Sequence, residues 1–287
     1  MKPTDVTVLI PCHGKAPFLQ EAVRSVIEQN CENYEILIVL DRPSTETIET
    51  LENFMHLEEN IRYLSCPTPG ISAALNFGIL NCTSEFIARI DADDVMEPTR
   101  LKEQIKILRN NSDIVCVGSQ ISIIDEQGKF LRKSHFPTKP NKVSQCLRIR
   151  NVMAHPSVMM RRSTVIEAGL YRDEWNGAED YDLWFRLAKL GRLLNIEQPL
   201  TRYRIHDNQV TKRNRLNQQE LDNSVRKVNL LNTSTPRMLK ASKEINHAIG
   251  SKGIRRSYHF SNAIFLSPRL SFLFVRYFLI PEILDPR

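Results

Sequence analysis

Three carboxylates follow a short apolar run in the segment FIARIDADDVMEP, residues 86–98. They belong to Asp91, Asp93 and Asp94. Side chains two positions apart in an extended segment point the same way, so Asp91 and Asp93 can converge on one site. Hard carboxylate oxygens suit Mg²⁺ or Mn²⁺, particularly where substrate phosphates supply further ligands. The alternative is an acidic turn whose aspartates accept backbone amides.

Several other sites are excluded by spacing. A calcium EF-hand starting at Asp91 would place Val95 and Met96 at its fifth and sixth positions and Lys102 at its twelfth. The sequence contains neither GxGxxG after the first apolar run nor GxxxxGK[ST]. The missing motifs therefore argue against a Rossmann dehydrogenase and a P-loop enzyme. A nucleotide held by carboxylates and a metal remains compatible with the sequence.

Two further acidic positions could serve a nucleotide-dependent reaction. Asp41 ends the run YEILIVLD and could accept the imide N–H of uracil, or it could be a turn residue. Glu179 and Asp180 begin the helical pattern GAEDYDLWFRLAKLG, residues 177–191. A positioned carboxylate there could remove a proton from an acceptor. The alternative is that both carboxylates stabilise the helix by about 0.3–1 kcal/mol through its dipole.

The segment RYRIHDN, residues 202–208, adds basic candidates. Arg202, Arg204 and His206 alternate, so on a strand they would share one face. Arg204 could meet a diphosphate, and a neutral His206 could complete a metal shell. The alternative for His206 is a hydrogen-bonded turn residue.

Two aromatic residues are candidates for the acceptor side. His155, before a proline, could line an acceptor pocket. Trp184 lies one turn after Asp180 and could stack on an acceptor sugar. Its helical spacing with Leu187 and Leu190 fits a core position equally well.

Alternating strands and helices must position these residues. Strands are expected at 6–10, 34–41, 61–64 and 85–91, and helices at 17–29, about 44–57 and 70–80. This order predicts an α/β fold with a mainly parallel sheet. Because ligands bind outside the carboxyl ends of such strands, Asp41 and Asp91 should face one crevice.

The second half of the chain leaves the parallel pattern. A helix at about 98–110 precedes a hairpin from 113–125 and 130–136, a strand at 155–162, the helix at 177–191 and a final segment at 198–211. The predicted domains are a catalytic domain over 1–212, with a nucleotide-binding half at about 1–110 and an acceptor half at 111–212. Residues 213–287 form a basic helical C-terminal region, the second predicted unit.

Composition predicts a globular protein in a reducing compartment. The 287 residues are 41% hydrophobic and 25% charged, enough for a sizeable core. The six cysteines contain no CxxC pair, which argues against a disulfide framework or a structural zinc site. The start MKPTDVTVLIP is too short and polar for a secretory signal. No run reaches the roughly 18 apolar residues of a spanning helix, since Arg276 interrupts residues 270–281.

The net charge of +6 suggests a polyanionic neighbour, but the sign alone does not separate nucleic acid, anionic lipid and nucleotide. Basic residues gather between Arg237 and Arg276 among aromatic and aliphatic side chains, against the single acidic residue Glu244. Such a segment suits the interface of an anionic bilayer. The alternative is a helical bundle packed on the catalytic domain or on a second subunit.

Five blocks, in this order and spacing, resemble inverting glycosyltransferase family 2 with its GT-A fold. They are VTVLIPCHGKAPFLQEAVRSVIEQ, YEILIVLD, GISAALNFGI, IARIDADDVMEPTRL and GAEDYDLWFRLAKLG. The resemblance covers about residues 4–210 and is nearest to transferases of bacterial surface polysaccharides, including the O-antigen type. It implies a Rossmann-like, mainly parallel sheet flanked by helices, a small mixed sheet and C-terminal helices.

The resemblance also implies roles position by position. Pro11 and His13 would border the nucleotide base, Asp41 would contact uracil, and Gly70, Ala74, Asn76 and Gly78 would lie on the helix beside the donor. Asp91 and Asp93 match the DxD pair, with Asp93 the direct metal ligand, Asp91 nearer ribose or a bound water, and Asp94 an additional metal candidate. Asp180 matches the catalytic base, with Glu179 orienting the acceptor or substituting. Departures from the family pattern are Leu40, His13 and Leu75.

The function implied is metal-dependent transfer of a hexose, galactose or glucose, from a UDP-sugar. The expected cofactor is Mn²⁺ or Mg²⁺, and the expected acceptor is an N-acetylhexosamine on undecaprenyl diphosphate in O-antigen or capsule-type synthesis. The protein is expected to be cytoplasmic and peripheral on the inner face of the bacterial inner membrane, with no nucleic-acid partner. One alternative is a catalytically inactive sugar-binding or scaffold module of a synthase complex. Another is a sugar nucleotidyltransferase, which would need a more glycine-rich loop than PCHGKAPF.

Overall fold

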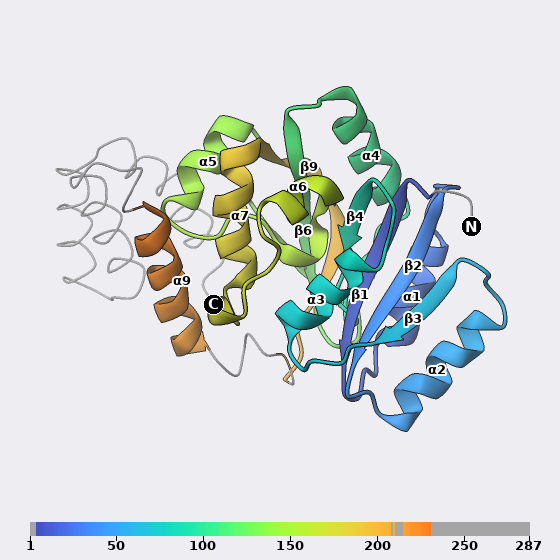
Figure 1. The fold of residues 1–287 in the computed structure, drawn as a ribbon. Coiled ribbons are helices and arrows are strands. Elements are labelled where there is room, and N and C mark those ends of the chain that lie inside the picture. Colours follow the sequence, from blue (N-terminus) through green and yellow to red (C-terminus); the bar gives the residue numbers. More distant parts are fainter. Residues whose placement is uncertain (1–3, 208, 210–214, 231–287) are drawn as a thin grey trace.

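The computed structural model describes residues 4–207, 209 and 215–230 (Figure 1). The strands are β1 (Val6–His13), β2 (Tyr34–Asp41), β3 (Ile61–Ser65), β4 (Phe86–Arg89), β5 (Val95–Met96), β6 (Ile114–Ile124), β7 (Phe130–Lys133), β8 (Met159–Arg161) and β9 (Arg192–Arg204). The helices are α1 (Leu19–Ile27), α2 (Thr45–Met55), α3 (Ile71–Leu80), α4 (Arg100–Asn110), α5 (Pro140–Leu147), α6 (Arg162–Glu167), α7 (Glu179–Leu190) and α9 (Arg215–Leu230), with short 3-10 turns η1 (His155–Ser157) and η2 (Asp173–Trp175).

One mixed sheet joins both halves of the described chain. Its strand order is β3-β2-β1-β4-β8-β6-β9-β5, with β7 paired to β6 beside this path. The first four strands are parallel, whereas β8 is antiparallel to both β4 and β6. Because β8 pairs with β4 on one edge and with β6 on the other, it joins the parallel strands and the strands of the second half into one sheet. The expected α/β class is confirmed.

The side chains on the two faces of the sheet are buried in two separate hydrophobic cores. Val8 and Ile36 belong to one buried cluster, with α1 and α4, while the neighbouring Leu9 and Leu37 belong to the other, with α3 and α7. Alternate side chains of a strand point to opposite faces, so strands covered on both sides must be apolar throughout. This requirement explains the continuous apolar runs in β1 and β2.

Helix α3 approaches the sheet closely because it carries Gly78. A Cβ atom at this position would lie 2.3 Å from Leu9 Cδ1 and 3.0 Å from Val39 Cγ2. The missing side chain lets the helix pack directly onto β1 and β2. Its amino end, beside Gly70, is thereby held at the carboxyl ends of these strands.

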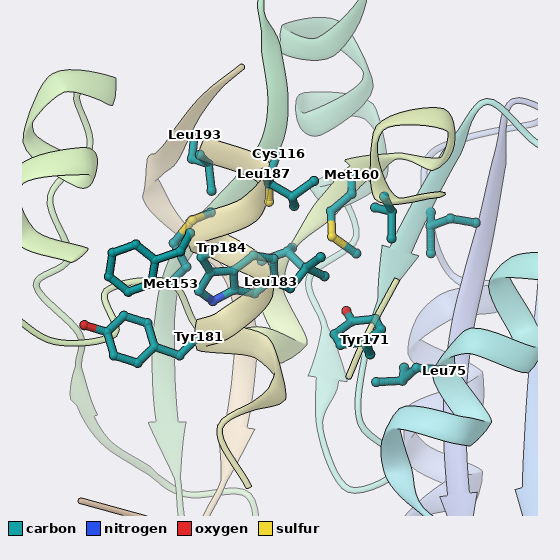
Figure 2. Close-up of a cluster of buried hydrophobic side chains, with 14 of the residues drawn as sticks. Leu75, Cys116, Met153, Met160, Tyr171, Tyr181, Leu183, Trp184, Leu187 and Leu193 are labelled. Carbon is teal, nitrogen blue, oxygen red and sulfur yellow. The ribbon is translucent and has the colours of Figure 1, made fainter. Parts of the chain in front are cut away.

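Helix α7 supplies the centre of the second core. Figure 2 shows Trp184, Leu183 and Leu187 among Cys116 and Met153. Trp184 and Leu187 are fully buried. The predicted helix at 177–191 is thus observed from Glu179, and Gly177 before it adopts a positive φ of 96°.

The strand expected at 155–162 is only partly a strand. Residues His155–Ser157 form a 3-10 turn that contains Pro156, and the strand proper is β8, Met159–Arg161. Proline has no N–H for a sheet ladder, which accounts for the late start. Helices α5 and α6 were not expected from the sequence pattern.

The beginning of the predicted C-terminal region packs on the catalytic half. Helix α9 lies beside α7 (Figure 1), and its Val225 is fully buried in the core that contains Trp184. Residues 237–281, which carry the predicted membrane-binding character, lie outside the described residues. Within the described part of the chain, no helix is both long enough and apolar enough to pass through a bilayer.

Candidate active site

The aspartates after β4 converge as predicted, although they lie in a turn and not in the extended segment that the prediction assumed. Asp91, Asp93 and Asp94 each place a carboxylate oxygen within 4.8 Å of the others. The turn is closed by the Asp94 amide, which donates to the Asp91 carbonyl at 3.3 Å. Three carboxylates at this separation repel one another strongly unless positive charge compensates them.

Arg89 compensates one of them. Its buried guanidinium donates from Nη1 to Asp91 Oδ2 at 2.6 Å and from Nη2 to the second carboxylate oxygen. Burial, together with the charges of Asp93 and Glu179, outweighs the opposing effect of Arg89 and raises the pKa of Asp91 to about 6. Arg89 was not among the residues predicted from the sequence, although it lies two positions before Asp91 at the end of β4.

Asp93 and Asp94 have different partners. Asp93 Oδ2 lies 2.9 Å from His206 Nε2. Asp94 is fully buried, and its Oδ1 accepts the Arg204 amide at 2.8 Å. Its Oδ2 is buried without a hydrogen-bond partner in the described part of the chain. Burial, followed by the charges of Asp93 and Asp91, raises the pKa of Asp94 well above its ordinary value.

This donor set fits a divalent cation. Asp93 and Asp94 offer hard oxygens, one of them the buried atom without a partner, and His206 offers an imidazole nitrogen beside them. Mg²⁺ and Mn²⁺ accept such ligands. Asp91 is less available, because Arg89 already engages both of its oxygens.

Arg204 occupies a structural position behind this cluster. Its buried guanidinium pairs with Glu21 Oε2 at 2.5 Å, donates to the Asp93 carbonyl at 3.0 Å and to the Glu126 carbonyl at 2.9 Å. It also lies over the Phe18 ring, 4.5 Å from the ring centre. A guanidinium with these partners is not available to a donor diphosphate, which corrects the prediction for Arg204.

Asp41 ends β2, which β1 separates from β4, and three donors hold its carboxylate. Asp41 Oδ2 lies 3.1 Å from His13 Nδ1 and 3.0 Å from the Gly70 amide, and Oδ1 accepts Arg42 Nε at 3.0 Å. Burial raises the pKa of Asp41, but the bonds from Arg42, Gly70 and His13 together outweigh burial and lower it. Pro11 lies two positions before His13 within β1, buried and in register with Val39 of β2.

The first turn of α7 brings two more carboxylates. Glu179 Oε2 accepts the Gly177 amide at 2.7 Å. Asp180 Oδ2 accepts Asn151 Nδ2 at 2.8 Å, and Oδ1 accepts the Tyr181 amide at 2.6 Å. Burial and the adjacent Glu179 raise the pKa of Asp180 to about 7. Because Glu179 also raises the pKa of Asp91, the start of α7 lies within electrostatic reach of the aspartate cluster.

Three other candidates connect structural elements instead of facing a ligand. Asn76 exchanges two hydrogen bonds of 2.8 Å with the Tyr171 backbone. His155 Nε2 lies 2.9 Å from Tyr171 Oη, and burial lowers the His155 pKa well below its ordinary value. Trp184 is fully buried, so its ring has no face for a sugar. The acceptor roles expected for His155 and Trp184 are corrected accordingly, and for Trp184 the core alternative applies.

The sequence model of "Glycosyl transferase family 2" matches residues 7–168. This is more than half of the chain, and the chain belongs to this family of glycosyltransferases. Among its relatives, the O-antigen biosynthesis glycosyltransferase WbnJ of Escherichia coli is 29% identical over 211 residues, 72% of this chain and 82% of WbnJ. The amylovoran biosynthesis glycosyltransferase AmsE of Erwinia amylovora is 30% identical over 219 residues, 72% of this chain and 79% of AmsE.

Solved structures confirm the GT-A fold. S. aureus TarS 1-349 in complex with UDP-GlcNAc superposes with a TM-score of 0.65 at 15% identity, covering 94% of this chain and 84% of that one. The mannosyltransferase PcManGT of Pyrobaculum calidifontis, in complex with GDP-Man and Mn²⁺, gives a TM-score of 0.59 at 14% identity, covering 100% and 89%. At these identities the likeness establishes the fold alone.

Proposed function

We propose that this glycosyltransferase transfers a hexose from a UDP-sugar, with inversion, to a lipid-diphosphate-linked N-acetylhexosamine, using a divalent cation and Asp180 as base. The observation that carries the proposal is the grouping of three acidic sites. Asp41 lies at the end of β2, the aspartate cluster follows β4, and the first turn of α7 lies within electrostatic reach of Asp91. The carboxyl ends of parallel strands are where α/β sheets bind ligands.

A nucleotide donor is supported by the strand ends. Asp41, with its lowered pKa, is ionised at neutral pH and offers carboxylate acceptors beside the exposed ring of His13. Such an acceptor suits the imide N–H of uracil. The TarS complex contains a UDP-sugar on the same fold, which is consistent with this donor class.

A cation would be held by Asp93 and Asp94, with His206 beside them. When bound, it neutralises negative charge on the departing diphosphate. Mn²⁺ is present in the PcManGT complex, whose fold is the same.

Deprotonation of the acceptor hydroxyl falls to Asp180. A base with a pKa of about 7 is half ionised at neutral pH and still basic enough to accept a proton. Asn151 and the Tyr181 amide hold one oxygen each, which fixes the plane of the carboxylate. Single displacement needs no covalent intermediate, so one carboxylate suffices.

The acceptor and the location are inferred from relatives and charge. Relatives named for O-antigen and amylovoran biosynthesis make surface polysaccharide synthesis the proposed process, with sugars carried on undecaprenyl diphosphate. The basic, apolar segment between Arg237 and Arg276 would keep the enzyme on the inner face of the bacterial inner membrane. A truncation ending near Asn232 should leave the membrane fraction without detergent, and unchanged partition would contradict this part of the proposal.

Substrate binding and turnover should be tested separately. Thermal stabilisation by UDP with and without Mn²⁺ tests the nucleotide and cation sites. UDP release from UDP-Gal or UDP-Glc with a synthetic lipid-diphosphate N-acetylhexosamine tests transfer, and NMR of the product gives the anomeric configuration. Inversion with Mn²⁺-dependent release is expected. Binding without turnover over a broad acceptor panel would favour an inactive sugar-binding or scaffold module instead.

A further inference from the structure

Residues 148–153 form a loop after α5, and carbonyl groups of this loop and of Leu147 at the end of α5 accept side-chain hydrogen bonds. Tyr181 Oη donates to the Leu147 carbonyl, and Asn195 Nδ2 donates to the Val152 carbonyl at 3.0 Å. Ile149 and Val152 are fully buried. This anchoring loop contacts the first turn of α7 through the bond between Asn151 and Asp180.

Asn151 is the residue of the anchoring loop that touches Asp180. Its Oδ1 accepts the Met153 amide at 3.2 Å, and its Nδ2 donates to Asp180 Oδ2 at 2.8 Å. The bond from Met153 needs the carbonyl oxygen, so the amide orientation is set and the donor group must face Asp180. The second Asp180 oxygen accepts the Tyr181 amide.

Helix α9 anchors the same loop from outside the catalytic core. Arg226 is buried, and its Nη1 donates to the Ile149 carbonyl two positions before Asn151. Its Nη2 donates to Asn223 one turn earlier in α9. Val225 beside it is fully buried against the α7 side of the core. The anchoring loop therefore bonds Asp180 directly, and α9 bonds that loop.

We propose that Asn151 is a positioning residue that orients the Asp180 carboxylate, and that Arg226 of α9 holds Asn151 in place through the Ile149 carbonyl. The proposal rests on the proposed role of Asp180 as base. It makes α9, from the basic C-terminal region, part of the catalytic machinery.

Charges on all sides of Asp180 enter its titration. Burial and Glu179 raise the pKa of Asp180, the Asn151 bond lowers it, Asp222 of α9 raises it, and the Tyr181 amide lowers it. Burial, and then the charge of Asp180, raises the pKa of Tyr171, so these two groups are electrostatically coupled. Loss of the Asn151 donor should therefore move the titration upward.

Two substitutions at Asn151 separate positioning from packing. Asn151→Asp keeps the shape and the acceptor for Met153 but replaces the donor by a second carboxylate. Asn151→Ala removes both groups. We expect the acidic limb of the kcat/KM pH profile to move upward by about 1 to 2 pH units in Asn151→Ala, and further in Asn151→Asp. Activity should recover at high pH in both variants.

Arg226 is tested by a graded pair and a matched control. Arg226→Met should move the acidic limb of the kcat/KM profile upward by less than Asn151→Ala does. The shift in Arg226→Lys should lie between that of Arg226→Met and zero. Asn195→Ala removes a donor to the same loop without touching Asp180, and it should lower the Tm but leave the limb in place. An equal shift in Asn195→Ala would overturn the specific role of Arg226.

Asp180→Asn distinguishes the two levels of the proposal. If Asp180→Asn keeps turnover, the proposed base is wrong. If it loses turnover but Asn151→Asp leaves the limb unmoved, only the positioning role is wrong. If Asn151→Ala has no turnover, its Tm can be compared with that of Asn151→Ala/Asp180→Asn from about pH 5 to 9, because this difference reports the titration of Asp180. The same difference is measured between the parent and Asp180→Asn. If both differences depend on pH in the same way, the proposal is overturned.

Discussion

Replacing Asp180 by asparagine should separate catalysis from folding. The substitution preserves shape but removes the proposed proton acceptor. General-base catalysis contributes about 10²- to 10⁴-fold in rate, so turnover should fall by that factor. UDP binding should persist, because Asp41 and the aspartate cluster are unchanged.

The effect of Asp180→Asn on the free energy of unfolding depends on pH. The folded-state pKa of Asp180, about 7, lies above the ordinary value of 3.8. Protonated Asp180 therefore contributes its full share to the free energy of unfolding below the ordinary pKa. This contribution is lost as pH rises through the folded-state pKa of about 7. At 1.36 kcal/mol per pH unit, the two values correspond to at most about 4 kcal/mol, reduced by solvent screening at this partly exposed group.

Asparagine escapes this penalty but has one acceptor oxygen in place of two. Either Asn151 Nδ2 or the Tyr181 amide loses its partner, which costs about 1–3 kcal/mol. We therefore expect Asp180→Asn to unfold at a lower temperature than the parent at or below about pH 4, where the parent carboxyl is protonated in both states. The Tm of Asp180→Asn relative to the parent should then rise between about pH 4 and 7 and level off above pH 7.

Two measurements decide this prediction. Calorimetric Tm values across the pH range give the stability difference, and UDP release at saturating donor gives turnover. The parent kcat/KM should fall about ten-fold per pH unit below pH 7, because the protonated carboxyl cannot act as base. Turnover within a few-fold of the parent, or a Tm difference independent of pH, would refute the reasoning.

Three further predictions concern the cation cluster and the core that contains α3 and α7. Asp93→Ala removes the partner of His206 and should abolish the Mn²⁺-dependent part of UDP stabilisation in thermal-shift assays; an unchanged Mn²⁺ effect would contradict the proposed ligand. Gly78→Ala introduces a Cβ 2.3 Å from Leu9 Cδ1 and should lower the free energy of unfolding by about 1–3 kcal/mol in urea titrations, whereas unchanged stability would mean that α3 can shift outward. Trp184→Phe should lower that free energy by about 1–3 kcal/mol while the KM for the acceptor stays constant, and a changed KM with full stability would restore the acceptor role.

The sequence predicted the first half of the fold closely. The run YEILIVLD was expected to be a strand at 34–41, and β2 is Tyr34–Asp41. Strands buried on both faces are apolar without interruption, so their limits are visible in the sequence. In the second half, β9 begins at Arg192, although the strand-like segment was expected only from 198. Its polar and apolar residues are mixed, and pairing with β6 decides its extent.

The site was predictable in its carboxylates but not in their partners. Asp91 and Asp93 converge as predicted, but they do so in a turn closed by the Asp94 amide and not in an extended segment. Asp41 lies beside His13 because their strands are in register. Asn151 could not have been found, because its contact with Asp180 depends on how two distant segments pack. Arg204 was misjudged for the same reason: alternation along a strand does not tell which face of that strand is covered.

Strand β9 also fixes when the aspartate cluster is completed. The Arg204 amide reaches Asp94 across 110 positions of the chain, and His206 follows two residues later. A nascent polypeptide emerging from the ribosome can assemble β1 to β4 long before these contacts exist. Prematurely terminated products would thus carry the acidic turn without its covering strand, and catalytic competence would be acquired only when synthesis of the sheet is almost finished.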